Sequence, residues 1–319
     1  MADVFFDVNS NIRAVGSIRR GTDGNPQSLD ASIADGDTIG FHCAGSGSLR
    51  FLGVDTPEKN FQLPGSSAHR RLDSEEWDAY LTDPFLPRFG PYNLDADLIA
   101  HLRNRFGPGA GINHRFHGEN AEQALIVHVQ ADMDALGQTP DTFGYFLSFS
   151  FEVFDSYGRF LAFINRNQPD AHLPGPRPFS YNERQLEKGM ALPYFIWPNI
   201  APFRKASLLE AVFAPGTARR TAEASADLSR ARNFVRQARA NGMGVFNPTD
   251  PLRFEAFEVR YLGRRELPNR AVIDLSRDDD VILQAQHYFR IPSAEDRLFI
   301  PPAFVPLFVM RGWRLEGWF

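Results

Sequence analysis

The residues best suited to chemistry lie in two short runs between positions 35 and 58. Asp35 and Asp37 open the first run. Asp55 and Glu58 close the second, which carries Arg50 inside the apolar stretch Leu-Arg-Phe-Leu-Gly-Val. Carboxylates suit a hard divalent cation, and an arginine suits phosphate. A charge within an apolar strand also needs a partner that offsets it. This layout favours a metal-dependent phosphodiesterase.

Two predicted strands must position these carboxylates. Residues 38–43 and 48–54 have strand-like sequences, and Ala-Gly-Ser-Gly at 44–47 is typical of a turn, so we expect a hairpin. Antiparallel pairing places the start of the first strand beside the end of the second. The carboxylates before and after the hairpin should therefore lie close together in space.

The rest of the chain alternates between predicted strands and helices. Further strands are expected at 12–20, 143–154 and 160–164. Helices are expected at 121–136, 182–190 and 218–241. Residues 59–117 change character, and we interpret them as an insertion with helical pieces at 74–81 and 95–106. Short β-like runs follow near the C-terminus, at 254–262, 271–275, 297–300 and 304–310.

Composition narrows the class of protein. The net charge of -5 argues against a non-specific nucleic-acid coat protein, which binds mainly through excess positive charge. The single cysteine, Cys43, allows no internal disulfide. No run approaches the roughly 18 apolar residues of a membrane span, and the N-terminus lacks a signal-like pattern. We expect no membrane partner and either a cytoplasmic chain or one secreted after removal of a leader.

Three motifs together resemble the staphylococcal nuclease (thermonuclease) family. They are Asp-Gly-Asp-Thr at 35–38 with Leu-Arg-Phe-Leu-Gly-Val-Asp-Thr-Pro-Glu at 49–58, Asp-Ser-Tyr-Gly-Arg at 155–159, and the segment from Asn182-Glu183 to Gly-Met-Ala at 189–191. The resemblance covers about residues 10–250. It implies an α+β fold, a five-stranded OB-type barrel with packed helices, and calcium-dependent endonuclease activity on DNA and RNA.

The resemblance also implies roles for individual residues. Asp37, Asp55 and the backbone carbonyl of Thr56 would bind Ca²⁺, with Asp35 behind them. Arg50 and Arg159 would clamp the phosphate, and Glu58 would act as general base or orient the water. By position, three aromatic residues would contact nucleotide: Tyr157, Phe195 and Trp197. Ordinary core packing is the alternative for Phe195 and Trp197.

Some features stay open at this level. We divide the chain into a nuclease-like domain at 1–251, with its insertion at about 59–117, and a small β-rich C-terminal module at 252–319 that could instead be a fixed extension. Either addition could contact a protein partner or form a dimer. A binding module without turnover and a small-nucleotide phosphodiesterase are the alternative functions. His114 and His117 lack a third ligand at zinc-like spacing, so we expect a surface loop there.

Overall fold

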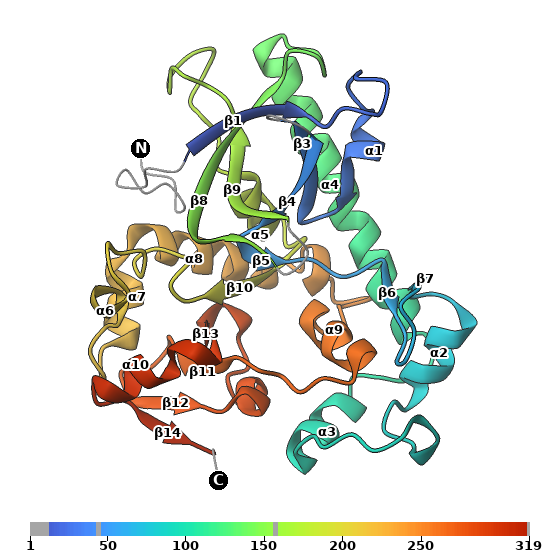
Figure 1. The fold of residues 1–319 in the computed structure, drawn as a ribbon, viewed down its shortest axis with the longest axis vertical. Coiled ribbons are helices and arrows are strands. Elements are labelled where there is room, and N and C mark those ends of the chain that lie inside the picture. The colour runs from blue at the N-terminus through green and yellow to red at the C-terminus, as the bar shows by residue number, and fades with distance from the viewer. Residues whose placement is uncertain (1–12, 43–45, 156–158, 318–319) are drawn as a thin grey trace.

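A closed barrel of five strands forms the upper part of the molecule in Figure 1, a computed structural model that describes residues 13–42, 46–155 and 159–317. The strands run in the order β1 (Arg13–Ile18), β8 (Gly144–Phe154), β9 (Phe160–Arg166), β4 (Ser46–Phe51) and β3 (Thr38–His42). Pairing of β1 with β3 closes the barrel, β4 and β9 pair in parallel, and β2 (Ile33–Asp35) adds to β3. The predicted α+β fold with an OB-type barrel is confirmed.

A second sheet joins the C-terminal segment to the barrel. Its order is β14 (Arg314–Glu316), β12 (Val281–Leu283), β11 (Ala271–Asp274), β13 (Arg297–Ile300), β10 (Leu192–Ile196) and β5 (Gly53–Asp55). Strand β13 pairs in parallel with β10, which pairs with β5 just after the barrel strand β4. Residues beyond 251 thus continue a sheet that starts at the predicted site.

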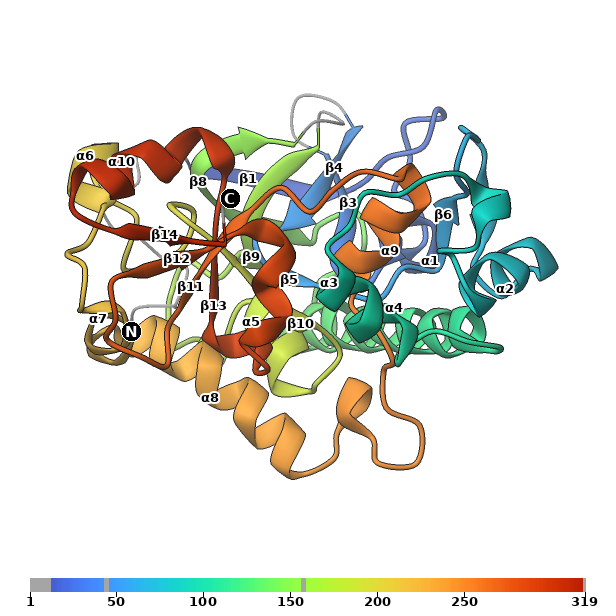
Figure 2. The same cartoon turned by 90° about the horizontal axis from the view of Figure 1, so that it is seen from below.

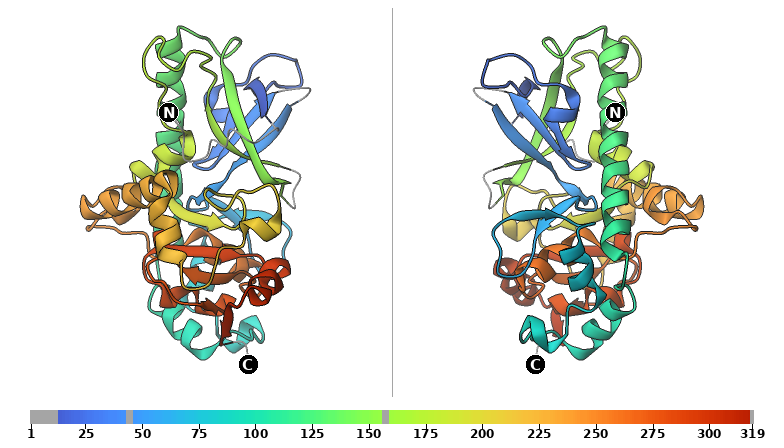
Figure 3. Two further views of the ribbon diagram at one scale, coloured as in Figure 1. Left: turned by 90° about the vertical axis from the view of Figure 1, so that its left-hand side faces the viewer. Right: turned by 90° about the vertical axis from the view of Figure 1, so that its right-hand side faces the viewer.

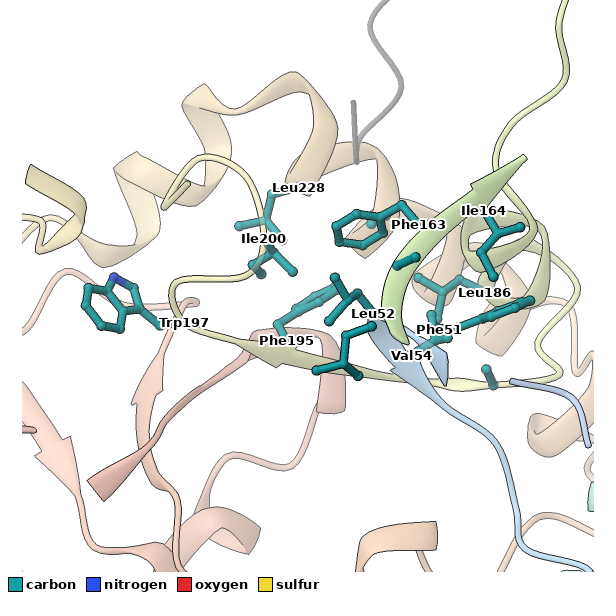
Figure 4. Packing of buried hydrophobic residues seen from close by; sticks show 14 of the residues in the cluster. Phe51, Leu52, Val54, Phe163, Ile164, Leu186, Phe195, Trp197, Ile200 and Leu228 are labelled. Carbon is teal, nitrogen blue, oxygen red and sulfur yellow. The ribbon is translucent and has the colours of Figure 1, made fainter. Parts of the chain in front are cut away.

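Buried apolar side chains fill the junction between the barrel and this sheet. Figure 4 shows Phe51, Val54 and Leu186 close together, with Phe195 lying near Leu52. The barrel strands contribute fully buried residues such as Ile39, Leu49, Leu147 and Ile164. Because this core is continuous, the end of β4 and the start of β5 are fixed by packing on both sides.

Helices surround these sheets. They are α1 (Leu29–Ser32), α2 (Glu75–Thr82), α3 (Ala96–Arg103), α4 (Ala110–Leu136), α5 (Tyr181–Glu187), α6 (Leu208–Ala211), α7 (Ala218–Ala224), α8 (Ala226–Ala240), α9 (Ala256–Arg264) and α10 (Val305–Met310). Short 3-10 turns are η1 (Pro87–Phe89), η2 (Gly244–Phe246), η3 (Ala285–Arg290), η4 (Ala294–Asp296) and η5 (Pro302–Phe304). Among the described residues, no helix has the length and apolar character to cross a bilayer.

The insertion and the C-terminal segment share a second hydrophobic core. The insertion supplies α2, α3 and a small sheet of β6 (Asn60–Gln62) and β7 (His69–Arg71), which lie next to α9 in Figures 1 and 2. Trp77 and Tyr80 of α2 are buried with Phe257 and Leu262 of α9, and the Tyr80 hydroxyl donates to the Leu262 carbonyl over 3.0 Å. The two additions therefore support one another.

Helix α4 links the insertion to the barrel. It begins already at Ala110, so the expected start at 121 and the insertion boundary at 117 both fall inside one continuous helix. Figure 3 shows it running along one side of the molecule past both sheets. Helix α4 approaches the 56–58 loop closely, because a Cβ on Gly118 would lie only 2.5 Å from the Pro57 carbonyl oxygen.

Two of the predicted C-terminal strands are helices. Residues 254–262 were expected as a strand, but α9 starts with a capping box in which Glu255 and Glu258 exchange hydrogen bonds, and Phe257, Tyr261 and Leu262 are buried at helical spacing. The run at 304–310 contains α10 (Val305–Met310), with a proline in its first turn.

The long helix predicted at 218–241 is two helices. Ser225 ends α7 and begins α8, where its hydroxyl caps the new helix by accepting a hydrogen bond from the Leu228 N–H. Apolar spacing alone does not reveal such a break, because the residues on both sides keep a helical pattern.

Candidate active site

One pocket brings together three residues that the sequence analysis placed in a phosphate site. Arg50, Glu58 and Arg159 come from separate parts of the chain and line the same cavity of ≈ 380 Å³. We call it the arginine pocket. Its other walls are Ala34 and Asp35 by the barrel, Lys59, Asn60, Phe61 and His69 of the insertion, and Arg260 and Arg264 of α9.

The turn between β2 and β3 holds Asp37 behind Arg50. The Asp37 carboxylate is buried and accepts hydrogen bonds from the Thr56 N–H at 3.0 Å and the Thr38 hydroxyl at 3.1 Å. Gly36 is required in this turn, because a Cβ there would lie 2.4 Å from the Cβ of Ala121. The motif glycine therefore lets the turn pack directly against α4.

Asp35 and Asp37 have opposite electrostatic behaviour. Burial would raise the pKa of Asp37, but the Arg50 guanidinium 3.5 Å away, the hydrogen bonds with Asp35 and Thr56 and the charge of Arg260 together hold that pKa below its ordinary value. Burial, together with the negative charges of Asp37 and Glu58, raises the pKa of Asp35 well above its ordinary value. Asp35 is thus the carboxyl group of this pair that retains a proton most readily.

Arg50 has the partners that its place in an apolar strand requires. It stands opposite Thr38 in the β3–β4 hairpin, which confirms the predicted pairing. Its Nη2 donates to Asp55 Oδ1 at 2.8 Å and lies 3.5 Å from Asp37 Oδ2. Two buried carboxylates thus offset the guanidinium charge, while its side chain keeps 16% of its surface exposed toward the pocket.

A second arginine, Arg260 of α9, enters the site from the C-terminal segment. Its Nη1 and Nη2 donate to the two oxygens of Asp55 at 2.9 and 2.6 Å, and Nη1 also donates to Glu58 Oε1 at 2.8 Å. The sequence analysis missed this residue. The available signal was the one that singled out Arg50: an arginine within a run of largely buried residues needs a carboxylate partner.

Glu58 is held by a histidine that we expected in a surface loop. That expectation is wrong, because His114 is fully buried on α4 and stacks on Phe254, with ring centroids 4.4 Å apart. The Glu58 N–H donates to His114 Nε2 at 2.9 Å, which assigns the ring proton to Nδ1. Burial lowers the pKa of His114 to about 3, so the ring is neutral. Burial also raises the pKa of Glu58, although Arg260 and Arg50 oppose that rise.

The third motif has a structural role at the back of the site. The Asn182 side chain donates to the Leu52 carbonyl at 2.8 Å and accepts from the Ile164 N–H at 3.0 Å, which ties β9 to the start of β5. Glu183 completes a capping box with Ser180 at the start of α5. These residues fix the strands that carry Arg50 and Asp55.

Two of the three predicted nucleotide contacts, Phe195 and Trp197, are not at the pocket. Phe195 and Trp197 have no exposed surface, and the Trp197 indole N–H donates to the Ala211 carbonyl at 2.9 Å. Their assignment to base stacking is wrong, because both belong to the core between the barrel and the second sheet. Tyr157 lies outside the described residues. Arg159 lines the pocket, and its Nε donates to Asp155 Oδ2 at 2.7 Å.

The predicted metal ligands do not form an open oxygen site as they lie here. Arg260 donates hydrogen bonds to both oxygens of Asp55, and Asp37 accepts hydrogen bonds from Thr56 and Thr38. This donor set does not fit Ca²⁺ in the present arrangement, and calcium stays a prediction.

Comparison with known proteins adds no family assignment. Neither the known protein-family models nor the curated proteins match this chain. The relation to the thermonuclease family therefore stays a resemblance, carried by the motif residues described above.

Proposed function

We propose that this chain hydrolyses phosphodiester bonds of DNA and RNA at the arginine pocket. The observation that supports the proposal is the convergence of Arg50, Glu58 and Arg159 on one cavity, although no local pattern joins position 159 to the other two. Two arginines beside a carboxylate match the needs of this reaction, since the reacting phosphate gains negative charge and a water must lose a proton.

The residues present suggest how the reaction runs. Arg50 and Arg159 donate to non-bridging phosphate oxygens, and Glu58 accepts a proton from a water whose oxygen forms the new bond to phosphorus. The ester oxygen on the opposite side leaves and takes up a proton. A raised pKa makes Glu58 a better proton acceptor than an ordinary glutamate, provided that it is ionised at the working pH.

The walls of the pocket favour a second candidate, a phosphodiesterase for small nucleotides. Asn60, Phe61 and His69 stand on one side and Arg264 on another, so the insertion and α9 both border the site. A cavity of ≈ 380 Å³ is in the lower part of the size range of small-ligand pockets, which is about 300–1,000 Å³. Such walls would select short substrates or chain ends over the interior of a duplex.

A cleavage assay separates these possibilities. Labelled single-stranded DNA, duplex DNA, RNA and a dinucleoside monophosphate would be incubated with the purified chain, with Ca²⁺ and with a chelator, alongside Glu58→Gln. Cleavage that drops by about 10²–10⁴-fold in the variant supports the proposal. Cleavage of the dinucleotide alone favours the second candidate. Nucleic-acid binding without any cleavage would replace both with a binding module.

A further inference from the structure

We propose that Arg260 takes the position of a divalent cation, so that a resident guanidinium neutralises Asp55 and Glu58 in the working site. Its three hydrogen bonds to these carboxylates are 2.6–2.9 Å long, and Arg50 also donates to Asp55 Oδ1 at 2.8 Å. The cationic charge that the resemblance assigns to calcium is thus supplied by a side chain from beyond residue 251. This inference rests on the proposed function only where it concerns phosphate.

Two arginines offset most of the negative charge of the three paired carboxylates without a metal. Asp37, Asp55 and Glu58 face Arg50 and Arg260. Asp55 is 4% exposed, so removal of its arginine partners would leave a buried carboxylate uncompensated. A divalent ion would have to displace Arg260, and this largely buried guanidinium would then lose both of its carboxylate partners, which disfavours binding of the ion.

Helix α9 is held firmly enough to keep Arg260 in place. Its N-terminal capping box is anchored by Arg297, which donates to Glu255 at 2.6 Å, and its C-terminal end is bonded to Tyr80 and Tyr92 of the insertion. Arg260 is therefore part of a packed scaffold and does not belong to a loose segment lying over the site.

Arg260 can also meet a phosphate. Its side chain keeps 16% of its surface exposed and lines the arginine pocket with Arg50 and Arg159. A guanidinium has five N–H donors, and the three bonds to carboxylates leave others for a phosphate oxygen. We therefore assign Arg260 as the third arginine of the phosphate-binding site.

Calorimetric titration with Ca²⁺ tests the inference without depending on turnover. The dissociation constant of wild type for Ca²⁺ should exceed about 10⁻³ M, the weak end of protein calcium sites. Arg260→Ala should bind Ca²⁺ at least tenfold more tightly than wild type. Arg314→Ala is the matched control, because Arg314 forms a similar two-bond pair with Asp280 at an exposed position, and it should behave as wild type. A wild-type dissociation constant below about 10⁻³ M would overturn the inference.

Binding of a 5′-mononucleotide in the presence of a chelator gives a second readout. Wild type should bind, and Arg260→Ala should bind at least about tenfold more weakly, since a charge-assisted donor to phosphate is lost. Arg260→Lys keeps the positive charge and is the variant to use if the alanine variant does not fold. It should bind Ca²⁺ as weakly as wild type. Equal nucleotide affinity in wild type and the folded alanine variant would remove Arg260 from the phosphate site.

The two proposals fail separately. Absence of cleavage on every substrate refutes phosphodiester hydrolysis, but the calcium titration still decides what Arg260 does. Cleavage that a chelator abolishes, together with tight calcium binding by wild type, supports the proposed function and refutes the substitution of the metal by Arg260.

Discussion

The neutral, buried His114 makes a quantitative prediction about stability. Its pKa falls from 6.5 to about 3 in the folded chain, chiefly because of burial and then because His117 and Arg260 are nearby. The unfolded chain therefore takes up a proton on this ring as the pH falls below about 6.5, whereas the folded chain does not. The stability that the neutral ring contributes is present above the unfolded pKa and is lost as the pH falls toward the folded pKa.

The size of this loss follows from the shift. Each pH unit between the two pKa values costs about 1.4 kcal/mol, so lowering the pH from about 6.5 to about 4.5 should cost about 2–3 kcal/mol from this group alone. That is a large share of the roughly 5–15 kcal/mol that separates folded and unfolded states of most domains.

Substitution of His114 by glutamine isolates the effect. The amide oxygen of Gln can accept the hydrogen bond from the Glu58 N–H, and the side chain does not titrate. Urea unfolding at about pH 7 and about pH 4.5 should show that wild type loses about 2–3 kcal/mol more than His114→Gln over that interval. The carboxylates titrate in both proteins and cancel in the difference.

A control and a refuting result complete this test. His172 is exposed, so His172→Gln controls for the loss of one histidine and should lose as much stability as wild type. If His114→Gln and wild type lose the same stability within about 0.5 kcal/mol, the ring is not a neutral buried group and its assigned bond to Glu58 is wrong.

Three further predictions concern the arginine pocket. Arg159→Ala should lower kcat by about 10²–10³-fold in the cleavage assay, and a decrease of only a few-fold would exclude it from the phosphate clamp. The wild-type kcat/KM should fall as the pH drops through the pKa of Glu58, which burial places above 4.5. Glu58→Gln should lose both the activity and this acid limb, so an acid limb that persists in residual activity would assign it to another group. Asp35→Asn should raise the melting temperature by a few degrees at neutral pH. The raised pKa of Asp35 means that the folded chain loses stability as the pH rises through that pKa, and an unchanged or lower melting temperature would contradict this assignment.

Short-range patterns account for the hairpin and for the pairing of Arg50. The hairpin that pairs Thr38 with Arg50 follows from two strand-like runs and a turn. The need of Arg50 for carboxylate partners follows from its apolar surroundings, and Asp37 and Asp55 supply them. These relations extend over a few residues or across one turn, so the order of residues along the chain contains them.

The C-terminal region shows where such patterns stop. Residues 254–262 have a mixed apolar pattern that suits either a strand or a helix. In the fold they form a helix, whose Phe257 and Leu262 pack against the insertion. The aromatic run at 194–197 was equally ambiguous, because stacking on a base and packing in a core call for the same side chains. Burial of Phe195 and Trp197 depends on β13 and α10, which come more than 90 positions later.

The sequence by itself therefore determined the hairpin, and its resemblance to the thermonuclease family predicted the barrel and grouped Arg50, Glu58 and Arg159 as candidates for phosphate chemistry. Only the tertiary structure decided that His114 accepts a hydrogen bond from the Glu58 backbone and that Arg260 forms ion pairs with Asp55 and Glu58. The physical reason is the range of these interactions. A strand repeats its side-chain pattern every second residue, whereas an ion pair between positions 55 and 260 exists only because two separately folded segments pack together.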